Sequence, residues 1–255
     1  MTTGEVTRLW PEAQAEPLDP AALAECYPRG TGPMMRVNFV SSLDGAVTLD
    51  GRSGGLSSPA DKQVFNILRL HCDALMVGAG TLRVEGYGPL LLRDKHRRER
   101  LDLDRAEHPT LVVVSARLDL EPEHPMLAEA PVRPIVLTHE ASPADKREAL
   151  AKVADVLVCG DIDVDLHAAM PALAERGLVA VLSEGGPHLL GALTAADLVD
   201  ELCLTVAPLL AGPGAGRITA GPPVPSPRDL RLVHVLAAGS ELILRYAGDA
   251  QASTQ

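Results

Sequence analysis

The stretch Val179-Ala-Val-Leu-Ser-Glu-Gly-Gly-Pro-His-Leu-Leu-Gly-Ala-Leu193 has the pattern of a buried strand that feeds a helix through a glycine turn. Four apolar residues open it, and Gly185 and Gly186 break the run. Pro187 suits the first position of a helix, where no N–H donor is needed. The free N–H groups and the positive dipole end of such a helix attract anions. By itself the stretch predicts either an anion-binding turn or a tight strand-to-helix turn without a ligand, with Glu184 at its mouth.

The composition is that of a globular protein with an aliphatic core, because 46% of the 255 residues are hydrophobic and only 2% are aromatic. The formal net charge of −11 argues against a nucleic acid or an anionic membrane as the main partner, since both require a basic surface. The four cysteines form no C-x-x-C pair, so we expect no metal site and no disulfide framework. The sequence shows no signal peptide and no run of roughly 20 apolar residues, which favours a cytoplasmic protein without a membrane span.

Short apolar runs alternate with helical patterns, which predicts an α/β fold with a mainly parallel sheet. Strands are expected at 34–42, 74–77, 110–114, 134–138, 156–159, 179–182 and 201–206. The segments 230–237 and 241–246 flank a Gly-Ser turn and are expected to form a closing antiparallel hairpin. Ser58 and Pro59 are expected to begin a helix, with Ser58 as the N-cap.

Two segments stand outside this alternation. Residues 1–30 contain several prolines and little periodicity, and we interpret them as an N-terminal arm that lies on the domain or on a partner subunit. The mixed-charge run 93–108 is expected to be a solvated loop or helix face. Since no linker separates two independent cores, residues 31–250 are expected to form a single domain.

Ligands of open α/β sheets bind outside the carboxyl ends of the strands. Four predicted strand ends carry glycine or polar residues there, at 41–45, 78–81, 115–117 and 183–187. The chain lacks the G-x-G-x-x-G, P-loop, G-x-S-x-G and H-E-x-x-H motifs. Two separated glycine turns suit an extended dinucleotide better than a single phosphate.

The order of these motifs resembles a known family. Its marks are Ser-Leu-Asp-Gly (42–45), Ser-Pro (58–59), Arg69, Gly-Ala-Gly-Thr (78–81), Pro-Leu (89–90), Ser115 and Ser-Glu-Gly-Gly-Pro (183–187). From about Met34 to Tyr246 the chain is similar to the reductase domain of riboflavin biosynthesis, the carboxy-terminal half of the bifunctional pyrimidine deaminase–reductase. The resemblance implies a dihydrofolate-reductase-like three-layer fold and a cytoplasmic homodimer. It also implies NADPH-dependent reduction of a ribosylaminopyrimidine 5′-phosphate to the ribitylamino product, by hydride transfer to ribose C1′.

The resemblance also implies roles for individual residues. The cofactor-binding positions are Val40, Gly55, Gly78, Thr81, Glu85, Ser115, Gly185, Gly186, Pro187, His188, Leu189 and Leu190. The substrate-binding positions are Ser53, Arg69, Leu91, Arg93 and Glu184. Arg69 is the candidate for the substrate phosphate, because a guanidinium binds phosphate bidentately.

Asp44 and Glu184 are the candidate catalytic carboxylates, although Asp44 is equally explained as a turn-forming residue. Arg117 is either a ligand of the NADPH 2′-phosphate or a solvated loop residue.

The segment 84–89 departs from the acidic segment that the family has after Thr81, and Gly55 replaces a tryptophan often seen near the cofactor. The zinc-binding deaminase half is missing, so the resemblance implies that deamination occurs on another chain. Two alternatives therefore stay open. One is a dihydrofolate or pterin reductase of the same fold, and the other is a non-catalytic NADPH-binding protein.

Overall fold

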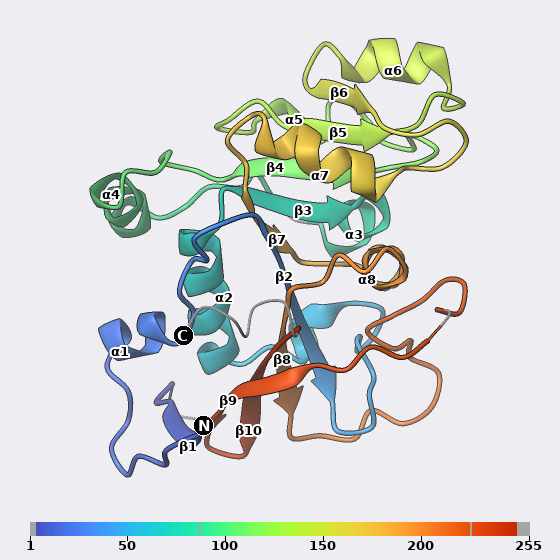
Figure 1. Cartoon of the computed structure of the whole chain (residues 1–255). Coiled ribbons are helices and arrows are strands. Elements are labelled where there is room, and N and C mark those ends of the chain that lie inside the picture. Colours follow the sequence, from blue (N-terminus) through green and yellow to red (C-terminus); the bar gives the residue numbers. More distant parts are fainter. Residues whose placement is uncertain (1–3, 87, 225, 249–255) are drawn as a thin grey trace.

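The apolar runs of the sequence form one ten-stranded sheet in the computed structural model, which describes residues 4–86, 88–224 and 226–248 (Figure 1). Its strands are β1 (Thr7–Trp10), β2 (Met34–Ser42), β3 (Ala74–Gly78), β4 (Thr110–Val114), β5 (Ile135–Thr138), β6 (Asp155–Val158), β7 (Ala180–Ser183), β8 (Glu201–Ala207), β9 (Arg231–Ala238) and β10 (Glu241–Ala247). Residues 1–3 of the predicted arm, 249–250 of the predicted domain, and positions 87 and 225 lie outside the described residues.

The strand order is β1-β9-β10-β8-β2-β7-β3-β4-β5-β6. The strands from β8 to β6 in this order pair in parallel, whereas β8, β10, β9 and β1 pair antiparallel. The predicted mainly parallel sheet and its closing hairpin are therefore confirmed. Strand β1 was not predicted, and it places part of the arm on the sheet of its own domain, where Val6 is buried.

Helices cover both faces of the sheet and give three layers. They are α1 (Pro20–Glu25), α2 (Pro59–His71), α3 (Ala79–Glu85), α4 (Asp94–Asp102), α5 (Pro125–Ala128), α6 (Ala144–Leu150), α7 (Leu166–Ala174) and α8 (Pro187–Ala195), with a short 3₁₀ turn at Ser53–Gly55. Apolar residues of α1, α2, α3, α5 and α6 join one buried cluster, and those of α7 and α8 join the other. None of the helices in the described ranges is long and apolar enough to cross a membrane.

Helix α2 begins as predicted. The Ser58 hydroxyl accepts hydrogen bonds from the N–H groups of Ala60 and Asp61, both at 3.1 Å, and Pro59 occupies the first helical position. This cap fixes the start of the helix whose face, further along, bears Arg69.

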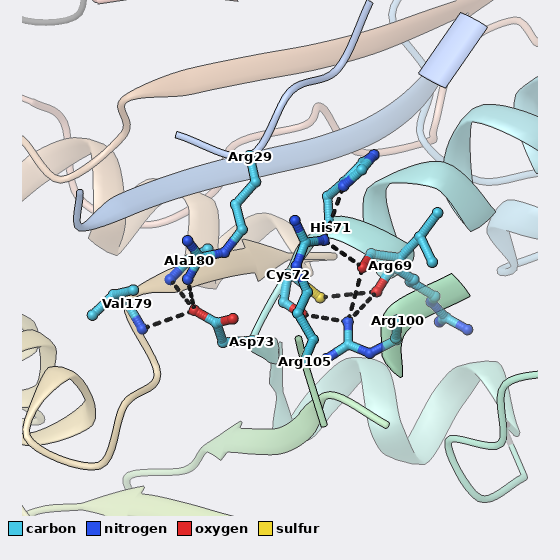
Figure 2. A network of polar contacts seen from close by, with 10 residues as sticks. Arg29, Arg69, His71, Cys72, Asp73, Arg100, Arg105, Val179 and Ala180 are labelled. Carbon is cyan, nitrogen blue, oxygen red and sulfur yellow. Dashed lines mark hydrogen bonds and ion pairs between the residues drawn. The ribbon is translucent and has the colours of Figure 1, made fainter. Parts of the chain in front are cut away.

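The charged run 93–108 is only partly solvated. The predicted solvated position is wrong for Arg100, which is 1% exposed. Its guanidinium donates to the carbonyl oxygens of Arg69, Leu70 and Cys72 at 3.1, 3.0 and 2.6 Å (Figure 2). The last carbonyl groups of a helix have no partner within the helix, and a guanidinium offers five donors. Arg100 therefore anchors α4 to the carboxyl end of α2.

Asp73, which lies between α2 and β3, binds the start of β7 (Figure 2). Its carboxylate accepts from the N–H groups of Val179 and Ala180 at 3.1 and 2.8 Å, and Arg29 donates to it at 2.6 Å. Because Asp73 directly precedes β3, these bonds fix the start of β7 beside β3. They thereby position the glycine turn at the end of β7.

Candidate functional site

The turn between β7 and α8 lies at the carboxyl edge of the parallel strands, where α/β sheets bind their ligands. Gly185 has a φ of +85°, and a Cβ atom there would lie 2.6 Å from Phe39 Cζ. A Cβ atom at Gly186 would lie 2.7 Å from Thr81 Oγ1. Only glycine fits both positions without a shift of these neighbours. The Gly185–Gly186 peptide is cis.

The start of α8 offers backbone donors. The N–H groups of Leu189 and Leu190 bond back to the Gly186 carbonyl at 2.9 and 3.1 Å. Within the part of the chain that the structure describes, the N–H groups of Gly186 and His188 bond no acceptor. Because these donors lie at the positive end of a helix of nine residues, the turn is suited to bind an anion.

Two cavities open on either side of the turn. The first has a volume of about 280 Å³ and is lined by residues of β2, α2, α3 and the turn. The second has a volume of about 910 Å³ and is lined by the ends of β3 and β4, by the start of α7 and by one face of α8. Gly186 and Pro187 line the first cavity, whereas His188 and Leu189 line the second. An elongated ligand with a central anionic group fits this arrangement.

Most predicted site residues line one of these cavities. The first is lined by Val40, Ser53, Thr81, Glu85, Glu184, Gly186 and Pro187. The second is lined by Gly78, Ser115, Arg117, His188 and Leu189. Ser53 and Glu85 also hold each other, because the Ser53 N–H donates to Glu85 Oε1 at 3.1 Å.

Other predicted residues do not line these cavities. Gly54 lines the first cavity in place of Gly55, which faces the Leu49 side chain. Leu190 is buried in the core, Gly185 lies under Phe39, and Leu91 and Arg93 are exposed before α4. The roles that the resemblance implies for these residues stay predictions.

Arg69 lies behind the wall of the first cavity, in an ion pair with Glu184. Its Nε and Nη2 atoms donate to the two Glu184 carboxylate oxygens at 2.7 and 2.6 Å. Its guanidinium also stacks on the Phe65 ring, 4.0 Å from the centroid. The Glu184 side chain is only 5% exposed, so Arg69 balances a nearly buried charge at the cavity wall.

Asp44 lies at the end of β2, and its carboxylate binds the loop after β8. It accepts hydrogen bonds from the Ser42 hydroxyl and from the N–H groups of Ala211 and Gly212, the latter two at 3.1 and 2.8 Å. The Ser42 hydroxyl, followed by these two N–H groups, lowers the pKa of Asp44 to about 2. Of the two interpretations left open by the sequence, this geometry favours the turn-forming one.

Residues 33–244 match the family described as the RibD C-terminal domain. The chain belongs to this family. A 2,5-diamino-6-ribosylamino-4(3H)-pyrimidinone 5′-phosphate reductase of Archaeoglobus fulgidus is 31% identical over 182 residues, which are 71% of this chain and 82% of the relative. The reductase of the same name from Methanothermobacter thermautotrophicus is 29% identical over 219 residues, or 84% of this chain and 97% of the relative.

A solved structure supports the same assignment. The crystal structure of a pyrimidine reductase-like protein from Corynebacterium diphtheriae is 28% identical, with a TM-score of 0.77, and the match covers 84% of this chain and 91% of that one. The family resemblance and the fold class predicted from the sequence are confirmed. Membership of this reductase family implies a nicotinamide cofactor.

Sequence reasoning missed several lining residues of this RibD-type site. Asp61, Lys62 and Phe65 lie on α2, and Asn38 lies on β2, two residues before Val40. A signal was present, because residues four apart on a helix share one face, and Asp61, Phe65 and Arg69 have this spacing. Asn38 and Val40 likewise share one face of a strand.

Proposed function

We propose that this member of the RibD C-terminal domain family reduces 2,5-diamino-6-ribosylamino-4(3H)-pyrimidinone 5′-phosphate in riboflavin biosynthesis, with NADPH as the cofactor. Two relatives that carry this name match 71% and 84% of the chain. The structural observation that carries the proposal is the glycine turn between two cavities. One cavity accommodates the reacting groups and the other the distal half of a dinucleotide.

The residues around the turn fit a dinucleotide. The Gly186 and His188 N–H groups would hold the diphosphate at the start of α8, where a larger residue in place of Gly186 would fill the space. Ser115 lines the second cavity beyond β4, on the side proposed for the adenosine.

A group of cations favours NADPH over NADH. Lys146 lies 2.6 Å and Arg117 lies 3.5 Å from the Asp119 carboxylate, and Arg83 donates to the Asp119 carbonyl at 2.8 Å. The side chains of Lys146, Arg117 and Arg83 thus surround Asp119 at the edge of the second cavity, which Asp163 and Asp165 also line. Arg117 follows Ser115 closely, so this corner is suited to the 2′-phosphate of NADPH.

The first cavity fits the substrate. Glu184 can accept hydrogen bonds from ribosyl hydroxyl groups while Arg69 balances its charge, because each carboxylate oxygen has two acceptor sites. Lys62 lines this cavity and is an exposed residue. Lys62 is therefore a second candidate, beside Arg69, for the cation that binds the 5′-phosphate.

The reaction adds a hydride to C1′ of the open-chain sugar and a proton to the adjoining nitrogen. The nicotinamide cofactor supplies the hydride when it is bound. Val40 and Phe39 form an apolar wall of the first cavity that excludes water from the reacting atoms. Asn38, Glu184 and Thr81 surround the same space and would orient the substrate against that wall.

Oxidation of NADPH, followed by its absorbance, tests the proposed function with separate candidate substrates. We expect turnover with the 2,5-diamino compound, slower turnover with its deaminated counterpart and none with dihydrofolate. Turnover with dihydrofolate alone would replace the proposal with a folate reductase. NADPH binding without oxidation of any substrate would replace it with a non-catalytic binding protein. Equal efficiency with NADH and NADPH would show that Arg117 and its neighbouring cations do not bind the 2′-phosphate.

The anion site is tested by Gly186→Val. The added side chain would enter the space beside Thr81 Oγ1, so we expect the Kd for NADPH to rise at least roughly 30-fold. Gly32→Val is the matched control, because a Cβ atom at Gly32 meets no atom within 4 Å and the residue lines neither cavity. Titration of each variant with NADPH, with thermal unfolding to show that it is folded, measures the effect. Unchanged affinity in Gly186→Val would refute the site.

We also propose that the enzyme is a homodimer, as the resemblance implies. The sequence offered the N-terminal arm and the closing segment as candidate contacts.

A further inference from the structure

Helix α4 is attached to the protein through a charged side chain. Eight of its nine residues are partly or fully exposed, and its one buried residue is Arg100. Its Leu101 is 51% exposed, and Leu103, directly after the helix, is 48% exposed. A surface helix normally packs against the core through an apolar stripe, whereas α4 packs through a guanidinium. What α4 does in the fold therefore lies in the contacts of Arg100.

The contacts of Arg100 gather at the carboxyl end of α2. Its Nη1 atom donates to the carbonyl oxygens of Arg69, Leu70 and Cys72, while its Nε atom donates to the Ala106 carbonyl at 2.6 Å (Figure 2). The carboxyl end of a helix has a partial negative charge, which a buried cation complements. Arg100 thus supplies both the donors and the charge that the last turn of α2 requires.

Arg105 adds a second guanidinium to the same turn. Its Nη1 atom donates to the Leu70 carbonyl at 3.0 Å and lies 3.0 Å from Nδ1 of His71 (Figure 2). Because a guanidinium has no acceptor, the His71 nitrogen accepts this bond. Burial, followed by the charge of Arg105, lowers the pKa of His71 to about 4, so the ring is neutral, as the bond requires. Two arginines from the segment 100–105 therefore hold the last turn of α2.

The turn that they hold is the one that bears Arg69. The Arg69 carbonyl accepts from Arg100, and the Arg69 guanidinium donates to both carboxylate oxygens of Glu184. An arginine side chain has many rotamers, so a two-bond contact requires its backbone to stay in place. Glu184 lines the first cavity with a side chain that is only 5% exposed. A displaced Arg69 would leave this nearly buried charge without its balance.

The Glu184 side of the pair has anchors of its own. Asp73 binds the N–H groups that begin β7, and β7 has only four residues before Glu184. The Glu184 N–H also donates to the Met76 carbonyl of β3 at 3.0 Å. Loss of Arg100 is therefore expected to displace Arg69 rather than Glu184.

We propose that Arg100 is a positioning residue of the substrate site, which holds the last turn of α2 and thereby keeps Arg69 aligned with Glu184. Arg100 is not among the lining residues of either cavity, so it acts through Arg69 and not by contact with a ligand. This inference rests on the proposed function, because it assigns the Arg69–Glu184 pair a part in substrate binding. Substrate affinity then depends on a side chain that does not touch the substrate.

Steady-state kinetics of Arg100→Met test the proposal. We expect the substrate KM to rise about 10-fold while the NADPH KM stays within about 2-fold of wild type. Arg98→Met is the matched control, because Arg98 is an exposed residue of the same helix, and both KM values should stay near wild type. Arg100→Lys keeps the charge and three donors, so its substrate KM should rise only about 3-fold.

Thermal unfolding of each variant gives the temperature range in which it is folded and can be assayed. Should Arg100→Met fail to fold, Arg100→Lys carries the comparison with Arg98→Met. An equal rise of the substrate and NADPH KM values would indicate a general loss of structure and overturn the positioning role.

A double-mutant cycle tests whether Arg100 acts through Arg69. When Arg69→Ala is already present, adding Arg100→Met should change the substrate KM by less than about 2-fold, since the contact that Arg100 positions is gone. If the two substitutions instead multiply their separate effects on KM, Arg100 acts by another route and the proposal is refuted.

Nuclear magnetic resonance tests the same contact without a substrate. The Arg69 Nε–H donates to Glu184 at 2.7 Å, so its proton should exchange slowly with water. Its signal is assigned by its absence in Arg69→Lys. The exchange should become at least about 10-fold faster in Arg100→Met and stay unchanged in Arg98→Met. An unchanged rate in Arg100→Met would overturn the proposal. A wild-type chain that shows the slow signal but does not reduce the pyrimidine would refute the proposed function, while this exchange rate would still decide whether Arg100 positions Arg69.

Discussion

Two arginine–glutamate clusters of the molecule have different surroundings. At the end of β7, Arg69 binds Glu184 with two hydrogen bonds, beside a cavity. At the start of β8, Glu201 lies between Arg36, at 2.6 Å, and Arg245, and all three residues are buried. The chemical groups are the same, but only the first cluster can reach a small molecule.

The difference indicates what each cluster does. Burial alone would raise the pKa of Glu201, but Arg36 and Arg245 hold the pKa below its ordinary value. Arg36 also donates to the Pro28 carbonyl at 2.7 Å, and Arg245 donates to the Cys26 carbonyl at 2.7 Å, so the cluster ties the chain after α1 to the sheet. The Arg69–Glu184 pair has a carboxylate at the cavity wall. The Glu201 cluster serves stability, and the Arg69–Glu184 pair is suited to binding.

The largest expected effect is the loss of stability in Glu201→Gln. Removing one partner of a buried ion pair leaves uncompensated charge, here on Arg36 and Arg245, and costs about 3–5 kcal/mol. Thermal unfolding should show Tm lower by roughly 10 °C, while kcat and KM of the folded enzyme stay near wild type. A stable variant with impaired kinetics would reverse the roles of the two clusters.

The same variant has a pH signature. The folded-state pKa of Glu201 is lowered, so its contribution is present above the unfolded-state pKa near 4.5 and is lost as the pH falls below it. The difference in unfolding free energy between wild type and Glu201→Gln should therefore shrink below about pH 4.5. Chemical denaturation of both proteins between neutral and acidic pH measures this difference.

A smaller effect is expected at the cavity. Glu184→Gln keeps the shape of the side chain but removes its charge, so kcat/KM should fall roughly 30-fold, equivalent to about 2 kcal/mol, with a smaller change in Tm than in Glu201→Gln.

Arg69→Ala should raise the substrate KM more than the cofactor KM. A dephosphorylated substrate separates the two roles of Arg69. If Arg69→Ala also raises the KM of the dephosphorylated substrate, Arg69 acts by positioning Glu184. If the rise in KM disappears with this substrate, Arg69 binds the phosphate.

The sequence predicted the features that depend on local chemistry. The valine- and leucine-rich strands and the Ser58 cap are determined by neighbouring residues, as is the glycine turn at Gly185. Strand β1 escaped prediction because it has only four residues and pairs with a strand about 230 positions away. Arg100 was assigned to a solvated surface because its charged neighbours dominate the pattern, whereas its actual partners are carbonyl groups at the end of α2.

In the site, too, local features could be predicted and long-range contacts could not. The backbone turn at Gly186 could be predicted from its residues, but the Arg69–Glu184 pair joins residues 115 positions apart, and only the fold brings them together. Without the sheet order, Glu184 was a residue at the mouth of a turn and Arg69 a cation on a helix. The contact between them ties Glu184, at the cavity wall, to helix α2, which bears Arg69.

The smallest effect is expected at Asp44, the other carboxylate at a strand end. A general acid needs a pKa near the working pH, whereas the hydrogen bonds from Ser42, Ala211 and Gly212 lower the pKa of Asp44 to about 2, so it remains ionised. We therefore expect Asp44→Asn to change kcat/KM by less than about 3-fold. Steady-state kinetics with saturating NADPH tests this expectation, and Ser42→Ala provides the control for a disturbed loop. If Asp44→Asn lost most of the activity and Ser42→Ala did not, Asp44 would take part in the reaction, and its bonds to residues 211–212 would have to open when substrate binds.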